Sequence, residues 1–135
     1  MISPQPGRRP AVDERGSATL LVIAAIAVVL TVASAMAIVV GYLGAIRRAG
    51  QAADLAAISA GQVVSHGEPG CPSAERVARD NGARVVRCAH VGDSVEFAVT
   101  VEVRYPVGLR LPGLPREVPG RASAGLQEPA AAQST

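Results

Sequence analysis

The sequence predicts an α+β protein in which one long N-terminal helix precedes a small domain of one short helix and an antiparallel β-sheet. Three observations lead to this fold class: an uninterrupted apolar run, an alanine-rich continuation of it, and a later stretch of alternating residues. At 135 residues the chain has room for one membrane span and one small domain. We divide it into a basic leader, a transmembrane helix, a helix extension, an α+β domain and a tail expected to be disordered, over residues 1–16, 17–46, 47–65, 66–126 and 127–135.

The apolar run has no charged residue from Gly16 to Ile46 and is almost purely aliphatic from Leu20 to Val40. At about 1.5 Å per residue the aliphatic part reaches about 32 Å, close to the roughly 30 Å hydrocarbon core of a bilayer. Its Leu, Ile and Val residues favour insertion by about 5 kcal/mol. A buried core helix is the alternative, but it needs a shell of protein that this short chain does not supply. We therefore predict a membrane-spanning helix with the lipid bilayer as partner.

A cleaved secretory signal is the second alternative to a permanent span. The patterns Ala33-Ser34-Ala35 and Ala35-Met36-Ala37 have the small-x-small spacing that signal peptidase reads. The apolar run, however, is longer than the 7 to 15 or so residues of a usual signal core, and it continues past both patterns. We expect an uncleaved span, with a secreted product as the alternative.

Charge gives the expected orientation and excludes one class of partner. Three arginines precede the span and two follow it, Arg47 and Arg48, which slightly favours a cytoplasmic N-terminus and an extracytoplasmic C-terminal domain in the cell membrane. The formal net charge is only +2, and the basic residues form no extended cluster. We therefore expect no nucleic-acid partner.

The helix is expected to continue beyond the span, because alanine dominates residues 49–60 and no proline follows Arg48 until Pro69. On a helical wheel the alanines share one side, and the polar side is interrupted by Leu55 and Ile58. Small residues also recur every four positions, at Ala33, Ala37, Gly41, Ala45, Ala49, Ala53, Ala57 and Gly61. Such a row forms a groove that another helix can approach closely, so it is our predicted helix-packing site. The alternative is that an alanine-rich composition produces the row by chance.

The α+β domain is predicted from shorter patterns. A short helix is expected over residues 71–82, and a strand rich in β-branched residues over 84–91. Strict alternation from Val95 to Tyr105 predicts a strand with one face on the core and one in water. A third strand is expected over residues 117–126, irregular or at the sheet edge because it contains Pro119 and Gly120.

The two cysteines are predicted to form a disulfide. Cys71 starts the short helix and Cys88 lies in the following strand, and closing a loop of this length contributes about 3 kcal/mol. A zinc site completed by His66 and His90 is the alternative. Its spacings do not match common zinc patterns, and an oxidising compartment favours the disulfide. We expect no metal and no cofactor.

The sequence does not predict an enzyme. It contains no convincing nucleophile beside a base and no phosphate-binding loop. Glu96 and Glu102 are expected on the solvent face of one strand, about 20 Å apart, which is too far for joint action on one bond.

A resemblance to a known family is carried by the order of the segments and two motifs. The motifs are Arg-Gly-Ser-Ala-Thr at 15–19 and Gln-Ala-Ala-Asp-Leu-Ala-Ala at 51–57, placed before and after the apolar span and followed by a cysteine-bracketed α+β domain. This arrangement resembles the TadE-like pilins of tight-adherence (Flp) systems, in particular the small actinobacterial branch. The resemblance covers residues 13 to about 124.

The resemblance implies a membrane-held pseudopilin or minor pilin of a pilus or secretion assembly at the cell surface. It implies that a prepilin peptidase cuts after Gly16, so that Ser17 becomes the N-terminus, and that other TadE-like or Flp subunits and tight-adherence assembly proteins are partners. The chain departs from the pattern at Leu21 and Val22, where processed Flp-type pilins carry Glu-Tyr. A function of another class is that of a secreted effector or binding protein released by signal-type cleavage.

Overall fold

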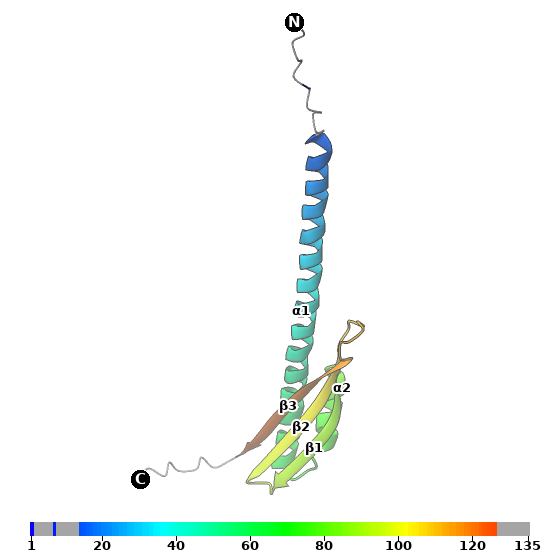
Figure 1. Cartoon of the computed structure of the whole chain (residues 1–135). Helices are drawn as coiled ribbons and strands as arrows, with labels where there is room; N and C mark the ends of the chain where they lie inside the picture. Colours follow the sequence, from blue (N-terminus) through cyan, green and yellow to red (C-terminus); the bar gives the residue numbers. More distant parts are fainter. Residues whose placement is uncertain (2–6, 8–13, 127–135) are drawn as a thin grey trace, which may run out of the picture. The chain divides into compact units, whose positions relative to one another are not determined.

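A computed structural model describes Met1, Gly7 and residues 14–126, and it confirms the α+β class. The elements are α1 (Glu14–Ser65), α2 (Cys71–Asp80), β1 (Arg84–Gly92), β2 (Phe97–Pro106) and β3 (Glu117–Leu126), shown in Figure 1. Most of the predicted leader and all of the predicted tail lie outside the described residues.

Helix α1 is a single helix of 52 residues that includes both the predicted span and the predicted extension. The chain separates into two compact units, with the boundary between Ala37 and Ile38 of this helix. The C-terminal part of α1 therefore belongs to the same unit as α2 and the sheet. The sequence-based division placed the domain at 66–126, whereas this unit begins at Ile38 because the alanine-rich helix forms part of its core.

The three strands form an antiparallel sheet in the order β1-β2-β3. The alternation in β2 has its expected effect: Val99, Val101 and Val103 are buried against the helices, and the residues between them face outward. Strand β2 begins at Phe97 rather than at Val95 because the Asp93 carboxylate accepts hydrogen bonds from the two backbone N–H groups just before the strand. Strand β3 lies at the sheet edge, where Pro119 is tolerated.

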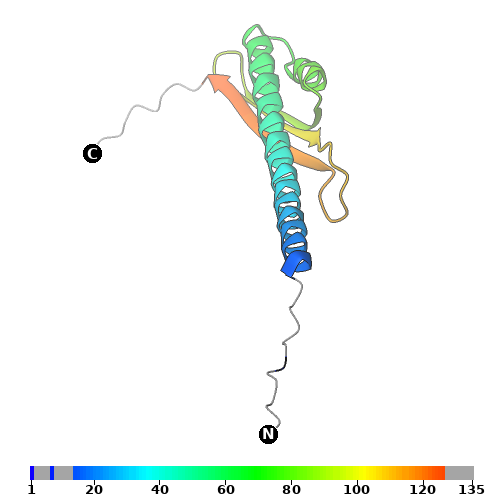
Figure 2. The same cartoon turned by 90° about the horizontal axis from the view of Figure 1, so that it is seen from above.

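The core of the second unit lies between the sheet and the alanine face of α1 (Figure 2). Six alanines of this face are at most 1% exposed: Ala49, Ala52, Ala53, Ala56, Ala57 and Ala60. A Cβ atom added to Gly120 of β3 would overlap the carbonyl oxygen of Ala49, so strand and helix backbones are in direct contact. Small residues on both sides allow this approach, and a core with Phe97 as its one buried aromatic ring among the described residues is filled by close backbone packing.

Helix α2 covers the same face of the sheet and is tied to its neighbours. Ala74 and Ala78 are buried in the core, and the Ser73 and Ser59 hydroxyls are hydrogen-bonded at 2.6 Å between α2 and α1. The connection from α1 is tight, because a Cβ atom at Gly70 would lie 2.7 Å from the carbonyl oxygen of Ala60. The close connection holds the start of α2 against α1.

Candidate membrane anchor and packing surfaces

The N-terminal part of α1 exposes large aliphatic side chains, among them Leu20, Val29 and Val40. Its most apolar window has a mean hydropathy of 2.8 and no buried residue. Among the described residues it is the one helix that is long and apolar enough to cross a membrane, a property that a signal sequence near the N-terminus shares. The segment is therefore compatible with a single-pass anchor or with a signal sequence.

The predicted processing site lies at the start of this helix. Gly16 and Ser17 are both helical and exposed, and a Cβ atom at Gly16 would meet no atom within 4 Å among the described residues. Leu21 and Val22 follow one turn later, also exposed. Both residues of the Gly16–Ser17 bond are thus exposed in the first turn of α1.

The row of small residues has two different environments. Ala33, Ala37 and Gly41 are exposed. The other five members, Ala45, Ala49, Ala53, Ala57 and Gly61, are buried within the second unit. Gly120 contacts the helix backbone at Ala49, and a Cβ atom at Gly61 would lie 3.5 Å from Ala124 and Phe97. All five positions are thus filled by the chain's own core, and at Ala49 and Gly61 the close neighbours are residues of the sheet.

The opposite face of α1 remains open in the second unit. Leu55 and Ile58 are 47% and 52% exposed, and they are surrounded by polar residues of the same helix. Next to Leu55 is an open recess of about 450 Å³. It is lined by Arg48, Gln51, Ala52, Asp54, Leu55, Asn81 and Tyr105. The two residues that interrupted the polar side of the helical wheel therefore form an exposed apolar contact surface.

The predicted disulfide is present. The Cys71 and Cys88 sulfur atoms are bonded to each other, which links the start of α2 to β1 across 17 residues of sequence. His66 contacts the carbonyl oxygen of Gln62 at 2.7 Å through its Nδ1 atom, and the His90 ring lies 6.5 Å from the Phe97 ring. Because both sulfur atoms are used in the disulfide, the alternative zinc site does not form.

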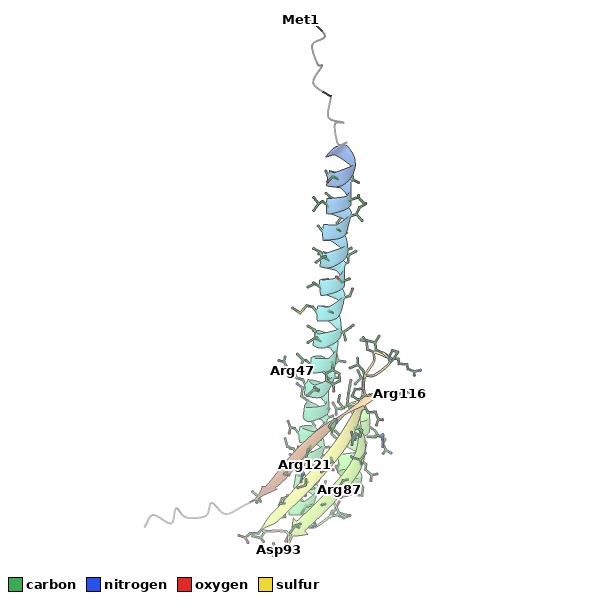
Figure 3. All side chains as sticks on the ribbon, in the orientation of Figure 1. Met1, Arg47, Arg87, Asp93, Arg116 and Arg121 are labelled. Atoms are coloured by element: carbon green, nitrogen blue, oxygen red, sulfur yellow. A yellow bond between two sulfur atoms is a disulfide. The ribbon has the colours of Figure 1, made fainter. Side chains whose placement is uncertain are left out.

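Ion pairs connect the strands across the outer face of the sheet. Arg84 of β1 donates two hydrogen bonds to Glu117 of β3, at 2.8 and 3.2 Å, and these bonds lower the pKa of Glu117 and raise that of Arg84. Arg121 lies 3.5 Å from Glu102. Sequence reasoning missed both pairs, because they depend on the strand register. Figure 3 labels Arg121 and Arg87, which lie in β3 and β1 on either side of Glu102 in the register.

The β1–β2 hairpin is closed by Asp93. Its carboxylate accepts hydrogen bonds from the backbone N–H groups of Glu96 and Val95 at 2.9 and 2.8 Å, which lower the pKa of Asp93. Glu96 therefore lies in the turn, while Glu102 lies in β2. The sequence placed both acids on one strand. In the structure Glu96 lies in the turn, and Glu102 forms a cross-strand ion pair with Arg121.

Comparison of the whole chain with known protein families, with curated proteins and with solved structures finds no match.

Proposed function

We propose that this protein is a TadE-like, membrane-anchored minor pilin or pseudopilin of a tight-adherence pilus or secretion assembly, and that it acts by helix packing and not by catalysis. The observation that carries the proposal is the continuity of α1. One helix supplies both an exposed apolar segment of membrane-spanning length and the core helix of a folded domain. The disulfide favours an extracytoplasmic location for this domain, because disulfides persist in oxidising compartments.

Two exposed surfaces of α1 support assembly through helix packing. In the apolar segment, Ala33 and Ala37 are small and exposed, which permits close approach of a neighbouring transmembrane helix. In the domain, Leu55 and Ile58 present an apolar contact to water. We propose that neighbouring pilin-like subunits cover both surfaces, and that the buried part of the small-residue row takes no part.

The first test is the intact mass of the protein extracted from membranes of its native host. The proposal expects either the complete chain or a product that begins at Ser17. A product that begins at Met36 or Ile38 would instead identify a signal peptide and remove the anchor.

The second test is cross-linking through a single introduced cysteine. Ile58→Cys lies on the proposed packing face, and Arg87→Cys on the outer sheet face is the matched control. The two native cysteines are bonded to each other and do not compete. After the introduced cysteine is labelled with a maleimide that carries a photo-cross-linking group and native membranes are irradiated, we expect the Ile58→Cys variant, but not the Arg87→Cys variant, to be linked to pilin-like subunits or tight-adherence assembly proteins identified by mass spectrometry. Equal cross-linking of both variants, or none of Ile58→Cys, contradicts the proposed face.

One observation favours the secreted effector or binding protein as a second candidate. The two signal-like patterns end at Ala35 and Ala37, and the second compact unit begins at Ile38. Cleavage at Ala37 would therefore release a product that contains this complete unit. A soluble form in the culture medium that begins at Met36 or Ile38 is the result that this candidate expects.

A further inference from the structure

The loop between β2 and β3, residues 107–116, lies beside α1 in both views (Figures 1 and 2). A Cβ atom at Gly41 would lie 3.6 Å from the Leu109 Cδ1 atom, so the loop reaches this level of the helix. The base of the loop is held by a small apolar cluster. It comprises Ala45, Ala49, Val107 and Val118, with Tyr42 and Tyr105 packed against it. The loop is therefore fixed against α1 near Gly41.

This level of α1 coincides with a membrane surface if the apolar segment spans the bilayer. Gly41 directly follows the aliphatic run Leu20–Val40, whose length matches the hydrocarbon core. From Gly41 to Arg47 the helix rises about 9 Å, comparable to the headgroup layer on one side of the bilayer. Tyr42 lies at this level, where tyrosine is enriched in membrane proteins.

The loop has a defined conformation. Leu111 and Leu114 are joined by a turn in which the Leu114 N–H donates to the Leu111 carbonyl oxygen at 3.2 Å. Pro112 and Gly113 occupy the central positions, and the φ angle of 87° at Gly113 is the left-handed conformation that a type II turn requires. The Val107 N–H also donates to the Arg116 carbonyl oxygen at 2.8 Å. Because the loop is already ordered, binding costs little conformational entropy.

The side chains of the loop combine apolar and basic groups. Leu109 and Leu111 are 39% and 38% exposed. Arg110 and Arg116 are exposed, and neither has a carboxylate within ion-pair distance among the residues that the structure describes. The acid that follows Arg116 in the sequence, Glu117, is already paired with Arg84. The loop therefore presents leucines together with two uncompensated positive charges.

We propose that loop 107–116 is a second membrane-contacting element, in which Leu109 and Leu111 enter the interfacial layer while Arg110 and Arg116 bind the phosphates of anionic phospholipids. This inference rests on the proposed membrane anchor. The burial of apolar side chains in the interfacial layer favours such contact, and so does the attraction of arginines to an anionic leaflet. The loop and α1 then hold the domain at two points, which restricts its tilt relative to the bilayer surface.

Tryptophan fluorescence tests the proposal directly, because the natural chain has no tryptophan. The full-length Leu111→Trp variant is reconstituted into phosphatidylcholine vesicles containing phosphatidylglycerol, with bromines on the acyl chains near the headgroup. We expect blue-shifted emission, quenching by the brominated lipid and several-fold weaker quenching by acrylamide than at a water-exposed site. Leu109→Trp is a second reporter in case Leu111→Trp does not fold.

Two control variants separate failure of this inference from failure of the anchor. Val95→Trp lies in the exposed β1–β2 hairpin and is expected to be quenched by acrylamide, while Leu30→Trp lies in the middle of the apolar segment and reports its insertion in vesicles whose lipids carry the bromines near the ends of the acyl chains. Lipid quenching of Leu30→Trp but not of Leu111→Trp overturns the loop contact and leaves the anchor intact. Absence of lipid quenching in both variants overturns both proposals. Protection of the Leu111→Trp variant from acrylamide without lipid quenching indicates a protein partner, such as a second copy, and also overturns the loop contact.

The arginines are tested in the Leu111→Trp background. Arg110→Gln with Arg116→Gln is expected to reduce the difference in lipid quenching between anionic vesicles and vesicles of phosphatidylcholine alone. An unchanged difference overturns the assignment of these two arginines to lipid phosphates.

Discussion

Between Leu20 and Val40, α1 carries large aliphatic side chains that are exposed, whereas between Ala45 and Val64 the same helix carries alanines that are almost completely buried. Both stretches are strongly helical, but the first is apolar on all sides, whereas the second carries Arg47, Arg48 and Asp54 on its open face and alanines on its buried face. The apolar side chains of the two stretches also differ in size. Large side chains gain most from transfer into lipid, while alanines allow the sheet backbone to approach the helix, as Gly120 does at Ala49.

The difference also shows how a domain with few aromatic residues is held together. Val99, Val101 and Val103 are completely buried, and burying each such side chain contributes about 1.5 to 3 kcal/mol. The helix alanines bury less area, but their small size brings the valines into contact with α1.

Leucine in the buried part of the row is expected to destabilise the domain strongly. The double variant Ala53→Leu and Ala57→Leu adds large side chains where the sheet already fills the space, at a cost of about 4 kcal/mol. Urea unfolding of the full-length protein in detergent, followed by tyrosine fluorescence, measures this because Tyr42 and Tyr105 both pack in this unit. The matched variant Ala33→Leu and Ala37→Leu lies at exposed positions and is expected to leave the midpoint unchanged. Equal effects of the two variants would contradict the contrast.

Loss of the disulfide is expected to cost about 3 kcal/mol, because the unfolded chain gains the entropy of a loop of this length. The Cys71→Ser and Cys88→Ser double variant should unfold at a lower urea concentration. Reduction of the natural protein is the control and should lower the midpoint by a similar amount. A midpoint that is unchanged by both treatments would show that packing alone holds α2 on the sheet.

Two glycine substitutions are expected to have opposite effects. In Gly120→Ala the new Cβ atom would overlap the backbone of α1, so we expect a loss of about 2 kcal/mol. In Gly50→Ala the new atom would meet nothing within 4 Å among the described residues, and alanine should stabilise the helix by about 0.5 to 1 kcal/mol. The same urea titration measures both. No destabilisation by Gly120→Ala would refute the close approach, and destabilisation by Gly50→Ala would show that the space at this helix position is not open.

Acid is expected to weaken the sheet slightly. The hydrogen bonds from Arg84 lower the pKa of Glu117, so the folded state binds protons less readily than the unfolded state. The resulting stability is complete above the ordinary pKa of 4.5 and is lost as the pH falls through the lower folded-state pKa. The effect is small because the pair is exposed to solvent. Asp93 contributes with the same sign, so in urea titrations at several pH values Glu117→Gln should reduce the acid dependence without removing it.

Local patterns in the sequence were sufficient to predict the individual elements. The apolar run and the alanine-rich continuation predicted one helix across residues 17–65, and α1 includes this whole range. Period-two alternation located the start of β2 to within two residues, and Pro119 correctly indicated an edge position for β3. The disulfide between Cys71 and Cys88 was also predicted, from the positions of the two cysteines at the start of the short helix and in the following strand.

The way these elements dock determines what fills the small-residue groove and where the β2–β3 loop lies. No local sequence pattern predicts either of these. The spacing from Ala45 to Gly61 shows that a backbone can approach closely, but a sheet and a second helix satisfy that spacing equally well. The partner is set by Gly120, whose position opposite Ala49 follows from the strand register and from the packing of the sheet on the helix. The pairing of Arg84 with Glu117 and the contact of Leu109 at Gly41 arise in the same way, because long-range contacts depend on how the elements dock and leave no local periodic pattern.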